Sequence, residues 1–213
     1  GRFEDMLHLA ENMIDFYILY NGPECGASAP DHMHFQAAGK EESLSTPFFK
    51  DFLNDIIEQT DFDDVPAIVN SYANNTFITS IGLASILRSE LIEKFENIYN
   101  ILSTFYGKEP LINIIAWYAI DSTKHGEDDE VVAWNCVIFL RSKHRPDCYY
   151  NQGGKGLLIS PAVAEMGGVF PIIREEDMDK LNTKEIIDIY KEISLSPEQF
   201  ETLCDELFRK DEV

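Results

Sequence analysis

Three polar side chains at alternate positions, His32, His34 and Gln36, are the clearest candidates for chemistry in this sequence. Met33 and Phe35 stand between them, and alternate side chains of a β-strand lie on the same face of a sheet. We therefore expect the two imidazoles and the amide to project together, while Met33 and Phe35 point into the core. The stretch directly follows a turn rich in glycine, alanine, serine and proline.

An imidazole in this setting is suited to attack phosphorus, because its ordinary pKa of about 6.5 leaves a substantial neutral fraction at pH 7. The attack gives a phosphoramidate and divides one difficult transfer into two easier steps. A neighbouring histidine can hold the geometry or move a proton. Gln36 can donate a hydrogen bond to a non-bridging oxygen but cannot act as a base. The backbone N–H of Gly26 and the hydroxyl of Ser28, in the preceding turn, are suited to bind a phosphate.

Two other interpretations of the histidine pair stay open at this point. A His-x-His pair on one strand face can bind a metal ion, although no cysteine or carboxylate at a convincing spacing completes such a site, and Asp31 should face the other way. Alternatively, the two histidines have no role, which is the commonest explanation of an isolated pair. Gln36 and the glycine-rich turn argue against that last interpretation.

Composition describes a folded globular protein and excludes several classes of function. The chain has 213 residues, of which 45% are hydrophobic and 12% aromatic, enough for a well-buried core. A formal net charge of -21 with 17 Lys and Arg argues against binding to nucleic acid. There is no apolar run of about 18 residues, no signal peptide and no cysteine framework. We expect a cytoplasmic protein that binds no membrane.

Two stretches, residues 3–36 and residues 85–141, repeat the order helix, strand, loop, strand. We expect an α+β fold, an antiparallel sheet flanked by helices, with two related halves. The individual elements are predicted from hydrophobic spacing. They are expected at 3–14, 16–20, 31–38, 48–57, 65–72, 76–81, 85–105, 111–120, 131–141, 183–193 and 197–210.

The proposed halves differ in their chemistry. We expect residues 1–82 to form the catalytic half and residues 83–213 to form a degenerate half with C-terminal helices. In the second half, the place of the histidines and the glutamine is taken by Asn135, Val137 and Phe139, so only the first half keeps titratable side chains at these positions.

The stretch 31–37 resembles the signature strand of the histidine-triad superfamily, in its nucleotidyltransferase branch. That branch has His-x-His-x-Gln in place of a third histidine. It includes galactose-1-phosphate uridylyltransferase, diadenosine tetraphosphate phosphorylase and GDP-L-galactose phosphorylase. Residues 20–22 and 26–28 resemble the turn of the diadenosine enzymes. Weaker similarity to the second half of the GDP-L-galactose enzymes extends over 112–118, 137–141, 161–168 and 194–196.

The resemblance implies a role for each residue of the motif. His34 would be the nucleophile that forms a nucleotidyl-histidine, His32 would support it, and Gln36 would bond the transferred phosphate. In this family a backbone carbonyl fixes the other ring nitrogen of the nucleophile. Glutamine in place of the third histidine goes with transfer to a phosphate acceptor instead of hydrolysis. The residues that the turn would place against the substrate are Asn21, Gly26 and Ser28, although the turn is one residue longer than in the diadenosine enzymes.

The resemblance also implies the reaction and its partners. We expect a nucleotidyltransferase or phosphorylase, either galactose-1-phosphate uridylyltransferase-like or GDP-hexose phosphorylase-like. It would act on a nucleotide sugar or a dinucleoside polyphosphate, with phosphate or a sugar 1-phosphate as acceptor. The covalent step needs no cofactor, and relatives often form homodimers through exposed strands. A catalytically silent nucleotide-binding domain on the same scaffold is the alternative.

Relatives carry a long N-terminal segment that helps to bind the base and, in some, zinc. We therefore expect this chain to be a fragment, with a shortened member of the superfamily as the alternative. Any Mg or Zn would belong to the segment that precedes it, and we assign no metal ligand within the chain itself.

The densest positive patch is the run Arg141, Lys143, His144 and Arg145, which ends a predicted strand. Loops at strand ends commonly carry sites, so Arg141, Lys143 and His144 could bind the anionic substrate or the incoming phosphate. An exposed strand end that balances the acidic run 127–130 is an equally good explanation. Proximity to the histidine motif decides between the two.

Overall fold

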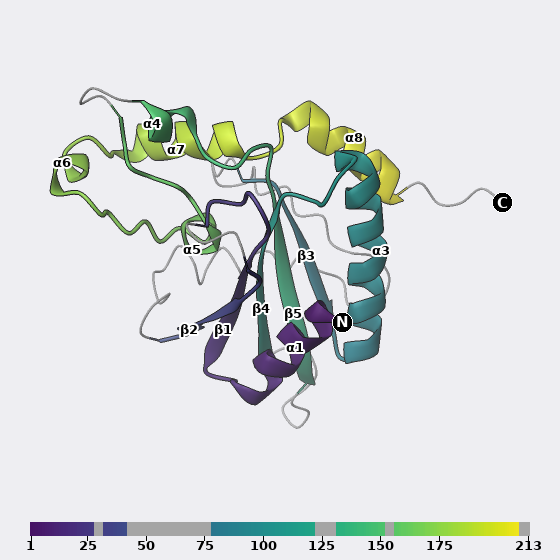
Figure 1. Ribbon diagram of the computed structural model, residues 1–213. Helices are drawn as coiled ribbons and strands as arrows, with labels where there is room; N and C mark the ends of the chain where they lie inside the picture. The colour runs from purple at the N-terminus through teal and green to yellow at the C-terminus, as the bar shows by residue number, and fades with distance from the viewer. Residues whose placement is uncertain (28–31, 42–77, 122–130, 152–155, 209–213) are drawn as a thin grey trace.

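The computed structural model describes residues 1–27, 32–41, 78–121, 131–151 and 156–208. These residues form one antiparallel sheet with helices packed against it, so the predicted α+β class is confirmed (Figure 1). Strands β2, β1, β4, β5 and β3 follow one another across the sheet, and every neighbouring pair is antiparallel. The strands are β1 (Phe16–Asn21), β2 (Phe35–Gly39), β3 (Ser80–Ser85), β4 (Ile112–Asp121) and β5 (Val131–Leu140).

The helices follow the predicted hydrophobic spacing where they are long. Helix α3 ends at Gly107, whose positive φ of 63° is a conformation that glycine adopts without strain. Helices α7 and α8 lie across one end of the sheet (Figure 1). No helix within the described ranges is long and apolar enough to cross a membrane. The helices are α1 (Arg2–Asn12), α3 (Arg88–Tyr106), α4 (Asp147–Tyr150), α5 (Val163–Met166), α6 (Glu175–Met178), α7 (Thr183–Ile193) and α8 (Pro197–Phe208).

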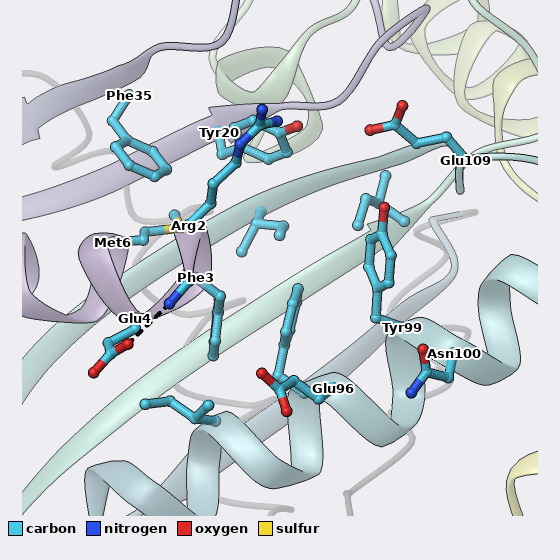
Figure 2. Close-up of a pocket in the computed structure, with 15 residues that line it drawn as sticks. Arg2, Phe3, Glu4, Met6, Tyr20, Phe35, Glu96, Tyr99, Asn100 and Glu109 are labelled. Atoms are coloured by element: carbon cyan, nitrogen blue, oxygen red, sulfur yellow. Dashed lines mark hydrogen bonds and ion pairs between the residues drawn. The ribbon is translucent and has the colours of Figure 1, made fainter.

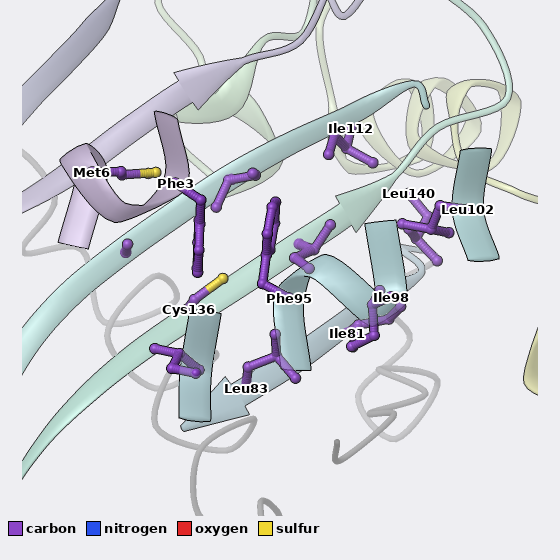
Figure 3. Close-up of a cluster of buried hydrophobic side chains, with 14 of the residues drawn as sticks. Phe3, Met6, Ile81, Leu83, Phe95, Ile98, Leu102, Ile112, Cys136 and Leu140 are labelled. Carbon is purple, nitrogen blue, oxygen red and sulfur yellow. The ribbon is translucent and has the colours of Figure 1, made fainter. Parts of the chain in front are cut away.

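Both faces of the sheet are covered by apolar side chains. Helices α1, α3 and α8 bury one face, where the rings of Phe3 and Phe95 stack with centroids 3.7 Å apart (Figure 3). The segment 157–159 and helices α5 and α7 bury the other face, against strand residues such as Ile115 and Phe139. Burial of this much apolar surface is the main stabilising term for the fold, at roughly 25 cal/mol per Å².

Strand β2 begins later than the sequence predicts. The expected strand covered residues 31–38, whereas pairing with β1 begins at Phe35, opposite Tyr20. The reason is that β1 ends at Asn21, so the register could extend by only one residue, to His34, while Met33 and His32 lie past the end of that strand. Met33 is 39% exposed, and the prediction that it points into the core is wrong. Phe35 does pack against the core on the α1 side, as expected.

Strands from both proposed halves pair within this one sheet. The boundary expected between residues 82 and 83 lies inside β3. The order helix, strand, strand nevertheless occurs twice, as α1–β1–β2 and as α3–β4–β5, and the two first strands lie side by side. The predicted elements at 48–57 and 65–72 lie outside the described residues.

Candidate functional site

His32 and His34 lie together just before β2. Their ring centroids are 5.1 Å apart, and Nδ1 of His34 lies 3.2 Å from the backbone carbonyl oxygen of His32. A carbonyl oxygen can only accept a hydrogen bond, so Nδ1 of His34 must carry the hydrogen. In the neutral imidazole, this leaves the lone pair on Nε2, which is the atom available as a nucleophile.

Gln36 lies on β2 with its side chain exposed. The antiparallel register places Gln36 opposite Leu19, and one further step along it would place His34 opposite Asn21. Oε1 of Gln36 accepts a hydrogen bond from Nδ2 of Asn21, at 3.3 Å. Asn21 and Gln36 therefore meet on the sheet face opposite to Phe35, because alternate residues of a strand face opposite ways.

Asn21, the last residue of β1, is held from two sides. Its Oδ1 accepts from Nδ2 of Asn113 at 2.6 Å and from the backbone N–H of Val163 at 2.8 Å. Asn113 is completely buried in β4 and also donates to the carbonyl oxygen of Cys25, at 3.0 Å. This expected substrate-binding residue thus joins β1, β4, the start of α5 and the tip of β2.

The turn that contains Gly26 is docked onto the C-terminal half of the chain. Gly26 has a φ of 85°, and a Cβ at this position would overlap the carbonyl group of Pro161, so only glycine fits without displacement. Its N–H donates to Nδ1 of His144 at 3.1 Å, and its carbonyl oxygen accepts from Oγ of Ser160 at 2.6 Å. The N–H that we expected to bind a phosphate is therefore occupied by His144. Ser28 lies outside the described residues.

Arg141 is placed differently from the expected substrate contact, because its side chain is completely buried. The guanidinium donates to Oδ1 of Asn113 at 3.0 Å and to the carbonyl oxygens of Pro161 and His144, each at 2.8 Å. Burial lowers the pKa of Arg141 to about 10, which still leaves it charged at neutral pH. Its contacts tie together three segments of the chain beneath the glycine-rich turn.

Lys143 and His144, the other two expected substrate contacts in the basic run, lie against different parts of the molecule. Lys143 forms ion pairs with Asp147, at 2.8 Å, and with Glu192, and so turns toward α4 and α7. His144 instead lies against the turn at Gly26. Burial, followed by the charge of Arg145, lowers the pKa of His144, which favours the unprotonated ring that accepts from that N–H.

The expected site residues did not include Asn113, Arg145 and Ser160, although Arg145 belongs to the basic run. Arg145 donates to Oγ of Ser160 at 2.7 Å and to the carbonyl oxygen of Ala27 at 3.3 Å. A signal for Asn113 was present: it is the one polar residue in the apolar run 111–117. A polar side chain in a strand that is buried on both faces must find hydrogen-bond partners, which marks it as part of a network.

A cavity of about 550 Å³ lies on the face covered by α1 and α3. Figure 2 shows Arg2, Tyr20 and Glu109 near one end of it, and Glu96 and Tyr99 projecting from α3. Tyr20 and Phe35, neighbours of the proposed site residues in the sequence, line this cavity. The cavity and the side chain of Gln36 are consequently on opposite faces of β2.

The described part of the chain contains no group of three or more His, Cys, Asp or Glu side chains that could hold a metal ion. The two neighbouring histidines therefore find no third protein ligand of this kind among those residues.

Two stretches of the chain match protein-family models. Residues 1–39 match "Domain of unknown function (DUF4922)", and residues 134–211 match "GDPGP1-like, C-terminal domain". The first stretch carries both histidines and Gln36, and the second carries Arg141 and His144. The second match supports a relationship to the GDP-hexose phosphorylase family. No curated protein and no solved structure matches the chain significantly.

Proposed function

We propose that this chain carries the nucleotidyl-transfer site of a GDP-hexose phosphorylase-like enzyme, with His34 as the nucleophile. The observation that carries the proposal is the contact between Nδ1 of His34 and the carbonyl oxygen of His32, which leaves Nε2 free to attack. The match of residues 134–211 to the GDPGP1-like model favours a GDP-hexose as substrate over a UDP-hexose.

In the first step, Nε2 of His34 attacks the phosphorus that carries the guanosine. An N–P bond forms, and the P–O bond to the second phosphate breaks, so hexose 1-phosphate leaves with the electron pair. This leaving group is a weak base and needs no proton from the protein. Nδ1 keeps its hydrogen, and the carbonyl oxygen of His32 stabilises the positive charge on the ring.

In the second step, an oxygen of inorganic phosphate attacks the same phosphorus. A P–O bond forms, the N–P bond breaks, and GDP leaves while His34 returns to its neutral form. Gln36 donates to a non-bridging oxygen in both steps, but has no basic atom with which to activate water. Transfer to phosphate is therefore favoured over hydrolysis, and neither step requires a cofactor.

The test is turnover by the purified protein. It is incubated with each GDP-hexose, each UDP-hexose and diadenosine tetraphosphate, with and without phosphate, while release of nucleoside mono- and diphosphates is followed. We expect phosphate-dependent release of GDP from a GDP-hexose, and a guanylyl adduct on His34 when phosphate is withheld. An adduct that still forms in His34→Ala would overturn the assignment. Faster turnover of UDP-glucose would replace it with a uridylyltransferase activity.

A catalytically silent nucleotide-binding domain is the second candidate, and the ion pairs of Lys143 favour it. Lys143 is held by Asp147 and Glu192 and is not directed at the histidines. Binding of GDP-hexose by the full chain, without adduct and without release of GDP, would support this second function.

A further inference from the structure

We infer that buried Arg141 determines which end of the Gln36 amide faces the substrate, through a chain of hydrogen bonds that passes through Asn113 and Asn21. These four residues are called the amide relay below. The inference rests on the proposed function, because it concerns the group that Gln36 presents to a phosphate. In this arrangement, Arg141, Asn113 and Asn21 are positioning residues, and only Gln36 touches the substrate.

The orientation of Gln36 matters because the two ends of an amide have opposite hydrogen-bonding capacities. The NH₂ end has two donors, whereas the carbonyl end only accepts. A phosphate oxygen is an acceptor, so the NH₂ end binds it and the carbonyl end repels it. An exposed glutamine that turned freely would spend part of its time in the wrong orientation.

Arg141 sets the direction in which each hydrogen bond of the relay is donated. A guanidinium has only donors, so the atom of Asn113 that lies 3.0 Å from it must be Oδ1. Nδ2 of Asn113 then faces Asn21 at 2.6 Å, and that contact requires Oδ1 of Asn21. Nδ2 of Asn21 in turn donates to Oε1 of Gln36 at 3.3 Å. Nε2 of Gln36 is left to point outward, and it makes no hydrogen bond to any residue in the described ranges.

Two backbone groups independently fix the same direction of hydrogen-bond donation. The carbonyl oxygen of Cys25 lies 3.0 Å from Nδ2 of Asn113 and can only accept. The N–H of Val163 lies 2.8 Å from Oδ1 of Asn21 and can only donate. Each asparagine is therefore held by a neighbour that cannot reverse its role. Flipping either amide would place two donors or two acceptors against each other.

The burial of Arg141 makes this anchor strong. Its hydrogen-bonded partners in the structure are an amide oxygen and backbone carbonyl oxygens, all of which are acceptors. Hydrogen bonds from a charged donor are stronger than those from a neutral donor, and a low local dielectric strengthens them further. Chains of such bonds also polarise one another, so the effect extends along the relay.

The substitution that tests the relay is Asn113→Asp. A carboxylate still accepts from Arg141, so the buried charge keeps a partner and the fold has reason to persist. The carboxylate cannot donate to Asn21. Asn21 then turns its NH₂ end toward position 113, because a hydrogen bond to a carboxylate is stronger than the bond from the N–H of Val163 that the flip gives up. Asn21 would present its oxygen to Gln36, and Gln36 would turn its NH₂ end inward. We expect kcat/KM for GDP release to fall about 10- to 100-fold, the effect of losing one hydrogen bond to a charged group.

Asn135 offers a matched control. It is a buried asparagine on β5 and shares its sheet face with Asn113, since Asn113 pairs with Phe139 in the register. Within the described ranges its side chain donates only to the carbonyl oxygen of Ala133. Asn135→Ala should lower stability while leaving kcat/KM within about twofold, whereas Asn113→Ala should lower both. Equal losses of activity in the two variants would indicate a merely structural role and overturn the relay.

A double-mutant cycle separates action through Gln36 from a general disturbance. If Asn113 acts through Gln36, Asn113→Asp has almost no further effect in a Gln36→Ala background, because the group it positions is already gone. If the two losses instead multiply, Asn113 acts by another route and the inference is wrong.

A measurement without turnover distinguishes failure of the relay from failure of the proposed function. In ¹⁵N-labelled protein, the side-chain NH₂ of Gln36 should exchange rapidly with water, and the NH₂ groups of Asn21 and Asn113 slowly. In Asn113→Asp, exchange at Gln36 should slow by about tenfold, as its NH₂ end turns inward. This result in a protein that releases no GDP would support the relay and reject the enzyme. Unchanged exchange at Gln36 in an active protein would do the reverse.

Discussion

The two helix–strand–strand units, α1–β1–β2 and α3–β4–β5, share one arrangement and differ in what they leave exposed. Each has a helix on the same face of the sheet and a second strand antiparallel to its first. In the first unit Gln36 lies opposite Leu19, and in the second Phe139 lies opposite Asn113. The two units meet at β1 and β4, in the middle of the sheet.

The two units differ in whether other parts of the chain cover their second strand. Strand β5 has a neighbour on both sides, and Val137 and Phe139 are completely buried under the C-terminal segment. Strand β2 is at the edge of the sheet formed by the described residues, and Gln36 is exposed. The same alternation of side chains therefore produces core in one unit and an exposed polar surface in the other.

The largest expected difference between the units is in activity. His34→Ala should reduce GDP release by at least about 1,000-fold, because it removes the proposed nucleophile. The matched substitution, Val137→Ala, should act on stability and leave the activity of the folded protein nearly unchanged. Initial rates, corrected for the folded fraction, provide the measurement. Activity of His34→Ala within tenfold of the parent would contradict the assigned role.

The next largest difference is in stability. Phe139→Ala should lower the free energy of unfolding by about 3–5 kcal/mol, because it leaves a cavity between the sheet and the C-terminal segment. Gln36→Ala changes an exposed side chain and should stay within about 0.5 kcal/mol of the parent. Urea denaturation compares the two. Similar losses in both variants would mean that β2 is covered in solution as β5 is.

A smaller difference in stability is expected between alanine substitutions at two glycines with positive φ, one from each unit. Gly26→Ala and Gly107→Ala both place a side chain in left-handed backbone, which costs about 1–2 kcal/mol. Only at Gly26 would the added Cβ overlap a neighbour, the carbonyl group of Pro161, whereas nothing lies within 4 Å of it at Gly107. Thermal or urea unfolding should therefore show the larger loss for Gly26→Ala. Equal losses would show that the turn moves away from Pro161 at no cost.

The smallest predicted effect is a dependence on pH. The pKa of His144 is lowered below its ordinary value of 6.5, first by burial and then by Arg145. The unfolded chain therefore binds more protons than the folded one just below pH 6.5, so stability falls as the pH drops through that window. His144→Gln should show a shallower loss between about pH 7.5 and about pH 5.5. Identical slopes in the two proteins would exclude this coupling to the turn at Gly26.

Sequence patterns were sufficient for elements whose signal is local. Helix α3 has an apolar stripe that includes Leu91, Phe95 and Ile98, followed by a glycine stop, and the structure ends it there. Strands β4 and β5 were equally clear, because each is an almost continuous apolar run. The start of β2 was not predictable in this way, since the alternation around Met33 continues beyond the point at which β1 ends.

The candidate site could likewise be predicted only in part from local sequence patterns. Strand periodicity predicts that His34 and Gln36 share a face, but the structure includes only Gln36 in the strand. Arg141 was identified as part of a charged patch, yet its burial depends on Asn113 and Pro161, which are distant in the sequence. Local spacing contains no information about such partners, and a basic residue at a strand end is usually exposed.

The bonds around Asn21 have a consequence for how the protein acquires its active form. Its bond to Asn113 joins residues 92 positions apart, and its bond to the N–H of Val163 joins residues 142 positions apart. Closing loops of this length costs conformational entropy, which is offset only once the contacts have formed. A topology rich in such non-local contacts therefore folds slowly. The β4–β5 pair can form early, whereas Gln36 gains its support only when β1 and the start of α5 have docked. During refolding, competence for transfer should therefore be acquired in the last kinetic phase, after most secondary structure has returned.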